Sequence, residues 1–418
     1  MIINIFKTFI LATNILLLDY YFIAENIRLT TLSVFLLILF YALENAVIRR
    51  RPTFTFDQNT GKILKVAFFF IGYIIFMDLY RGADIFKSMV FVISSAMVII
   101  LLPIFEDRRT PYNMHRWFNY LMFITMAFGL MQFLTNNNIL LADIISGLGI
   151  IGVDKGVDLE ILSDIYFRTT GATSNTIAFA LQVSIFIIIH YASFMQWKNP
   201  KILFNLIAAS FVLLTTQTRA AIFSLAPTII ATQILFTRMH KNYKKVKSLI
   251  ILALFIGIGY WFLNEFILNK FIYVTRNISE HDAHRFAVNW NLSIGVLRES
   301  PLFGIPPDYA WDIYLKYGDL RIYGYDPELK TPTHHNQLAF YLRYYGLIGV
   351  GLLCWLYAMI FRKIMQAKSF WIGVAIGSIF IFDLVFSMAH NNKLISSPLL
   401  WIFLSLASID PEKEETPF

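Results

Sequence analysis

Two adjacent histidines, His334 and His335, stand where a polar stretch of the chain meets an apolar run that begins at Leu338. Imidazole is the side chain whose ordinary pKa lies nearest neutrality, so it can take a proton from a hydroxyl group at working pH. Asn336 follows the pair directly. A histidine at a helix end is more often only hydrogen-bonded, but the position between water and hydrocarbon makes this pair the first candidate for a general base.

Two arginines flanked by apolar segments, Arg219 and Arg285, are candidates for binding an anion. Arg219 follows a polar break at 215–218, and Arg285 begins an amphipathic segment. An arginine near hydrocarbon is costly and usually faces a polar cavity or a counter-ion. A guanidinium can hold two phosphate oxygens at once. The simpler alternatives are an interfacial Arg219 whose charged end extends toward water and a solvated Arg285.

Two further segments carry polar or turn-forming residues. The stretch 168–175 contains Arg168, a glycine and several small hydroxyl residues. Such a stretch lets backbone N–H groups approach an anion or a sugar, although it would serve equally as the capping region of the next helix. The second segment, 299–307, is rich in proline and glycine, which end a helix and shape a turn. We therefore assign it an architectural role.

The elements that must position these residues are membrane helices. The chain is 57% hydrophobic and 15% charged, with a mean hydropathy of +0.60. Apolar segments of about 20 residues recur from end to end, which is the length that crosses a bilayer. The single cysteine, Cys354, excludes a disulfide framework. The sequence shows no basic face of the kind that binds nucleic acid, so no nucleic-acid partner is expected.

The apolar segments predict an all-α polytopic membrane protein, a single integral membrane domain over 1–418 with about 12 transmembrane helices. Clusters of lysine and arginine fall in alternate connections, which predicts that both termini are cytoplasmic. The expected spans are 4–24, 29–48, 64–81, 86–105, 117–135, 175–196, 202–217, 220–237, 248–268, 337–361, 370–389 and 394–409.

Two long connections are expected on the outer side, 136–174 and 269–336, and the second joins predicted helices 9 and 10. The second connection is rich in aromatic residues, which disordered segments lack. We therefore expect it to fold, with helices near 283–298 and 308–317. Four acidic residues of the apolar runs lie near span ends, where interfacial exposure is expected: Asp19, Glu44, Asp78 and Asp383.

Five segments, taken in order, resemble the O-antigen ligase and O-antigen polymerase superfamily. The segments are 217–220, 284–290, 298–304, 335–336 and 345–349. The resemblance covers about 200–350, around the predicted large outer loop. The first five predicted spans resemble that family only in number and hydrophobicity.

The resemblance implies a metal-independent, inverting membrane glycosyltransferase of the GT-C type, without a cofactor. The absence of an Asp-x-Asp motif also counts against a metal-dependent enzyme that uses nucleotide sugars. The implied donor is a glycan on undecaprenyl pyrophosphate, and the implied acceptor is another glycan. Arg219 and Arg285 match the arginines that would bind the pyrophosphate, and His335 matches the essential histidine. His334, Asn336 and Arg168 are further candidate substrate-binding residues.

The same resemblance implies a protein of the bacterial inner membrane whose active site is periplasmic. The segment 168–175 resembles the polymerases more than the ligases, so a polymerase of surface polysaccharide is expected, with a chain-length regulator as a further partner. A ligase that transfers the glycan to lipid A core is the first alternative. A secondary transporter is the second, since such proteins also have about 12 spans and intramembrane acidic residues. The sequence leaves open the glycan, the linkage, the chain length and the oligomeric state.

Overall fold

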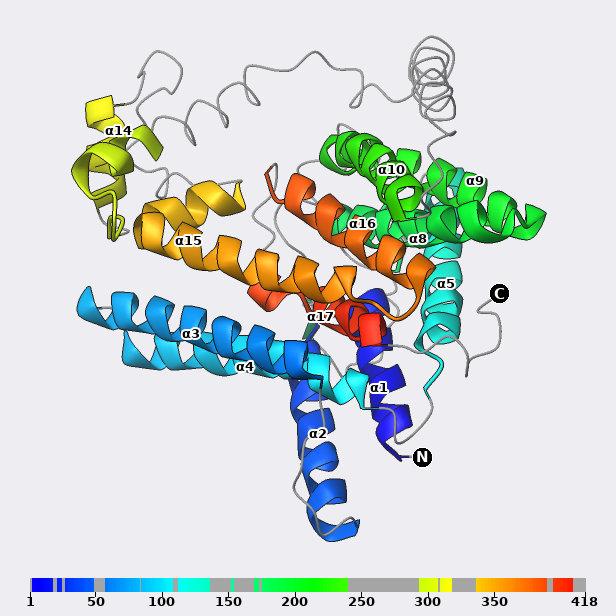
Figure 1. Cartoon of the computed structure of the whole chain (residues 1–418), viewed down its shortest axis with the longest axis horizontal. Helices are drawn as coiled ribbons and strands as arrows, with labels where there is room; N and C mark the ends of the chain where they lie inside the picture. Colours follow the sequence, from blue (N-terminus) through cyan, green and yellow to red (C-terminus); the bar gives the residue numbers. More distant parts are fainter. Residues whose placement is uncertain are drawn as a thin grey trace.

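The computed structural model describes residues 2–17, 21–24, 27–48, 57–82, 84–107, 112–135, 152–153, 169–172, 175–239, 293–306, 309–317, 336–388 and 394–408. Within these residues the protein is helical, apart from one small sheet (Figure 1). Most of the two predicted outer connections, 136–174 and 269–336, lies outside the described residues.

Five of the described helices are long and apolar enough to cross a membrane. They are α3 (Gln58–Tyr80), α4 (Ile85–Glu106), α5 (Met114–Thr135), α8 (Thr176–Trp197) and α15 (Gln337–Met365). Large apolar side chains also point outward from the bundle; Phe69 and Phe76 on α3 are both 62% exposed. Apolar helices with apolar outer faces are typical of a helical membrane protein.

Shorter apolar helices occupy six more of the predicted segments. They are α1 (Ile2–Ala12) with its continuation η1 (Thr13–Leu17), α2 (Leu29–Leu43) with η3 (Glu44–Ile48), α9 (Pro200–Thr215), α10 (Arg219–Met239), α16 (Phe370–Phe386), and α17 (Pro398–Ser405) between η8 (Leu394–Ser396) and η9 (Leu406–Ser408). The remaining predicted segment, 248–268, lies outside the described residues.

The first predicted span, 4–24, is wrong at its end. The helix stops at Leu17, and Tyr21–Ala24 form strand β1, which pairs with β2 (Ile27–Arg28) and β3 (Gly152–Val153). Two side chains weaken the helix before this point, because Thr13 Oγ1 and Asn14 Nδ2 both donate to the carbonyl of Ile10. Three of the four residues of β1, namely Tyr21, Phe22 and Ile23, are aromatic or β-branched and favour a strand.

Eight of the described helices pack as two groups (Figure 1). In the first, α3 lies along α4, α15 packs on α3, and α17 packs on α4. In the second, α8 packs on α9 and α10 packs on α16. Because α16 also contacts both α8 and α15, it joins the groups. A continuous apolar core runs through both, and its largest buried side chains include Phe70, Phe186, Tyr341 and Trp401.

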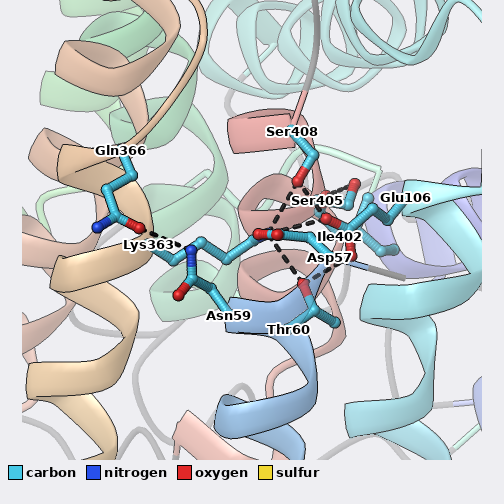
Figure 2. A network of polar contacts seen from close by, with 9 residues as sticks. All are labelled: Asp57, Asn59, Thr60, Glu106, Lys363, Gln366, Ile402, Ser405 and Ser408. Atoms are coloured by element: carbon cyan, nitrogen blue, oxygen red, sulfur yellow. Dashed lines mark hydrogen bonds and ion pairs between the residues drawn. The ribbon is translucent and has the colours of Figure 1, made fainter. Parts of the chain in front are cut away.

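One end of the first group is closed by a buried polar network around Lys363 (Figure 2). Lys363 is 2% exposed, and its ammonium donates to Glu106 at 2.8 Å, to Thr60 at 2.9 Å and to Ser408 at 2.8 Å. Asp57 lies 3.4 Å away. The network joins the start of α3, the end of α4, the end of α15 and η9, four points that the sequence predicted to share one side. Lys363 was expected in the loop after a span ending at 361, but α15 continues to Met365.

Candidate functional site

Helix α15 is broken one-third of the way along its length. Gly346 has φ +63° and ψ −164°, which is outside the helical region, so the residues before and after it form two helical pieces. A break of this kind leaves backbone carbonyl and N–H groups without their helical partners, and each must be bonded elsewhere in an apolar environment. The predicted span 337–361 gave no sign of the break.

A segment of the predicted large outer loop supplies most of the missing bonds. The N–H of Leu347 donates to the carbonyl of Pro301 at 2.8 Å, and the N–H of Ile348 donates to Leu302 at 3.3 Å. In the other direction, the N–H of Ile305 donates to the carbonyl of Arg343 at 2.7 Å. The turn 301–305 therefore completes the broken helix, as the architectural role assigned to 299–307 requires.

The turn is itself held by two short helices. Residues 293–299 are helical, as expected for part of 283–298, and α14 (Ala310–Tyr317) lies within the second expected helix, 308–317. Val296, Ile305 and Ile313 form a small buried cluster against them. Lys316 and Tyr317 both donate to the carboxylate of Glu299, and these hydrogen bonds hold the pKa of Glu299 below its ordinary value.

Side chains of helix α3 bond carbonyl groups that the break leaves without helical partners. Arg81, at the end of α3, donates to the carbonyl of Tyr344 and to that of Phe303 at 2.6 Å. The hydroxyl of Tyr73 donates to the carbonyl of Tyr345 at 2.9 Å. One guanidinium therefore joins the broken helix to the inserted turn. Sequence reasoning overlooked Arg81, since an arginine after a predicted span is usually only an interfacial residue.

The residues that directly follow His335 in the sequence form the start of α15. Asn336 caps the helix, because its side chain accepts a hydrogen bond from the N–H of Ala339 at 3.1 Å. The N–H of Gln337 donates to the carbonyl of Ser387, just beyond α16, at 2.8 Å. The end of α16 thus fixes the start of α15. The role that the structure shows for Asn336 is therefore that of a helix N-cap.

Asp383 is linked to the start of α15 through Tyr357, and its burial contradicts the expectation of interfacial exposure. It is fully buried in α16, rather than exposed at an interface as its position in the sequence indicated. Its Oδ2 lies 3.0 Å from the hydroxyl of Tyr357, which in turn lies 3.3 Å from Oε1 of Gln337. Tyr357, which bonds the buried carboxylate, is on a different helix, and no local pattern in the sequence reveals this contact.

Arg219 is the first residue of α10, and it follows a sharp turn after α9. Gln217 in this turn has φ +51°, a left-handed conformation that is uncommon outside glycine. The carbonyl of Thr218 accepts hydrogen bonds from Ala221 and Ile222 and so begins the helix. Arg219 therefore stands at the positive end of a helix, where N–H groups and a guanidinium together favour an anion.

The residues after Arg168 pack directly against this turn. Thr169 donates its N–H to the carbonyl of Thr215 at 3.3 Å, and the two threonine hydroxyls lie 2.8 Å apart. Gln132 on α5 holds the next residues, because its Oε1 accepts from the N–H groups of Thr170 and Gly171 at 2.9 and 3.0 Å. Gln132 is fully buried and was missed, although a lone glutamine inside an apolar run was a signal of such a role.

The structure thus describes two of the predicted site residues, Arg219 and Asn336. Four others lie outside the described residues: Arg168, Arg285, His334 and His335. Two pairs of segments that are distant in the sequence are brought together, namely 169–172 with 215–218 and 301–305 with 343–348. Each pair contains segments that sequence analysis had singled out separately.

Comparison with protein-family models finds none that matches this chain, and comparison with curated proteins finds no significant match.

Proposed function

We propose that this protein is a polymerase of O-antigen or a related surface polysaccharide. It would be a multi-pass protein of the bacterial inner membrane with about 12 spans and cytoplasmic termini. It would join glycan repeat units carried on undecaprenyl pyrophosphate at the periplasmic face, without a metal or a cofactor. The acceptor would be a second lipid-linked glycan, and a chain-length regulator would be a further partner.

The observation that carries the proposal is the insertion of the turn 301–305 into the break of α15. The two segments that meet there belong to 298–304 and 345–349, which carry the resemblance to the O-antigen enzymes. They are far apart in the chain, so their contact is a property of the fold rather than of local sequence. The insertion also connects the described parts of the large loop to the helix that begins after His335.

The proposed chemistry follows from charge. The hydroxyl oxygen of the acceptor sugar attacks the anomeric carbon of the donor, and the bond from that carbon to the pyrophosphate oxygen breaks. His335 takes the hydroxyl proton as general base, a contribution of about 10²–10⁴-fold in rate. The lipid pyrophosphate leaves with the bonding electrons. Arg219 and Arg285 stabilise the negative charge that accumulates on it.

The test is deletion of the gene followed by gel analysis of the lipopolysaccharide. Loss of a polymerase leaves the lipid A core carrying one repeat unit. Loss of a ligase leaves core without any repeat, and this result would replace the proposal by its first alternative. An unchanged ladder would contradict both.

Secondary transport is a second candidate, and two observations favour it. Broken helices and buried carboxylates occur at the substrate sites of transporters, and this chain has both at Gly346 and Asp383. Against it, the break is filled by the turn 301–305, so its backbone groups are already bonded. An Asp383→Asn variant that still produces a full polysaccharide ladder would exclude a transport mechanism that depends on this carboxylate.

A further inference from the structure

Gln337, the first residue of α15, is held on two sides. It is 1% exposed, and its backbone N–H donates to the carbonyl of Ser387. Its side-chain oxygen Oε1 lies 3.3 Å from the hydroxyl of Tyr357. Since Tyr357 is also in contact with the fully buried Asp383, the amide oxygen of Gln337 is the end of a short buried chain of polar groups.

The other end of the same amide has no such partner. Among the residues that the structure describes, none accepts a hydrogen bond from Nε2 of Gln337. A buried N–H group without an acceptor costs about 1–3 kcal/mol, and native proteins rarely retain one without a reason. Gln337 lies two residues after His335 and directly after the capping residue Asn336. The unpartnered donor therefore belongs to the segment that would carry the catalytic base.

We propose that Nε2 of Gln337 donates a hydrogen bond to an oxygen atom of the lipid-linked glycan, and that Tyr357 and Asp383 are positioning residues that hold the amide for this purpose. This inference rests on the proposed function, since it names a substrate contact of the same site. The ligand is defined by its chemistry, an oxygen acceptor on either a sugar or the pyrophosphate.

The contacts of Tyr357 fix which way the amide of Gln337 faces. The hydroxyl of Tyr357 has one proton and can serve only one acceptor at a time. Its oxygen lies 3.0 Å from Oδ2 of Asp383 and 3.3 Å from Oε1 of Gln337. With Oε1 toward Tyr357, the NH₂ group of Gln337 points away from it.

Two variants separate these roles. Gln337→Ala removes the donor itself. Tyr357→Phe removes the group that orients the donor. The matched control is Gln182→Ala, because Gln182 is also a glutamine with 1% exposure but lies on α8 and donates to the carbonyl of Asn14.

The experiment measures binding by the purified full-length protein in lipid nanodiscs. The probes are the undecaprenyl-pyrophosphate-linked glycan isolated from the deletion strain and glycan-free undecaprenyl pyrophosphate. Gln337→Ala should weaken binding of the glycan-bearing lipid about 3- to 10-fold, the value of one hydrogen bond. Tyr357→Phe should act in the same direction, whereas Gln182→Ala should bind as the wild type does.

The two probes identify the oxygen. Weaker binding of both lipids assigns the contact to the pyrophosphate, and weaker binding of the glycan-bearing lipid alone assigns it to a sugar hydroxyl. Wild-type affinity of Gln337→Ala for both lipids would overturn the inference while leaving the proposed function intact. Failure of the wild type to bind the lipid-linked glycan would instead contradict the proposed function.

Discussion

Gly304 and Gly346 pack against each other's backbone neighbours. Gly304 faces the backbone of residues 343–346, and Gly346 faces the backbone of residues 302–303. A Cβ atom on Gly304 would come too close to the carbonyl of Arg343, and one on Gly346 would come too close to the carbonyl of Leu302. Both residues also have positive φ, +74° and +63°. The close approach of the turn to the broken helix is therefore possible only with glycine at both positions.

Gly346→Ala should destabilise the protein by about 1–3 kcal/mol, because the left-handed conformation and the backbone collision cannot be relieved together. Thermal unfolding of the detergent-solubilised protein measures the effect. Gly351→Ala is the control, since it lies in the same helix with nothing within 4 Å of an added Cβ. An equal loss of stability in both variants would show that the inserted turn does not require Gly346.

Lys363→Met should be among the most destabilising single changes, at about 3–5 kcal/mol, because it leaves the carboxylate of Glu106 buried without its cation. Adding Glu106→Gln should recover part of the loss. The control is Lys316→Met, which breaks the surface pair with Glu299; its loss should cost little, because water screens an exposed ion pair. Equal unfolding temperatures for the two lysine variants would contradict the network of Figure 2.

Arg219→Lys keeps the charge at the start of α10 but loses the two-point grip of the guanidinium. Polymer formation should drop at least about tenfold, a change near 1.4 kcal/mol, with the protein inserted at its normal level. Ladder intensity on the lipopolysaccharide gel, normalised to protein, gives the measure. Arg116→Lys, on the exposed side of α5 beside Tyr120, should leave the ladder unchanged. Full activity of Arg219→Lys would refute a bidentate pyrophosphate contact.

His335→Ala should abolish glycan transfer at normal expression, whereas His334→Ala should leave measurable product. The reaction needs one general base, and the resemblance assigns that role to His335. A general base must be neutral, so the rate should fall as the pH drops through the ordinary imidazole pKa of about 6.5, while donor binding persists. The reverse pattern between the two variants would transfer the role to His334.

The sequence predicted the helices well where the signal is local. The turn between α9 and α10 was evident because four polar residues interrupt two apolar runs, and α10 begins at Arg219, one residue before the expected start at 220. The break in α15 was not evident, since a glycine among apolar residues is equally consistent with a continuous span. What breaks the helix is a turn some forty residues earlier in the chain.

Local sequence patterns also did not reveal which polar side chains form contacts with distant segments. Asp383 was expected at an interface because it lies near the end of an apolar run, yet it is buried against Tyr357. Gln132 and Arg81 take their roles from backbone groups on distant segments. Periodicity and charge bias locate helices and their ends. They carry no information on which helix receives a particular polar side chain.

The network around Lys363 has a consequence for biosynthesis. Glu106 and Lys363 are 257 positions apart, so the carboxylate leaves the ribosome long before the ammonium that neutralises it. Until then, α3 and α4 carry a carboxylate that is costly to bury without its cation. We therefore expect the early hairpin to keep this end in contact with water while the later spans are made. Closure of this corner by α15 and η9 should then be one of the last events in assembly.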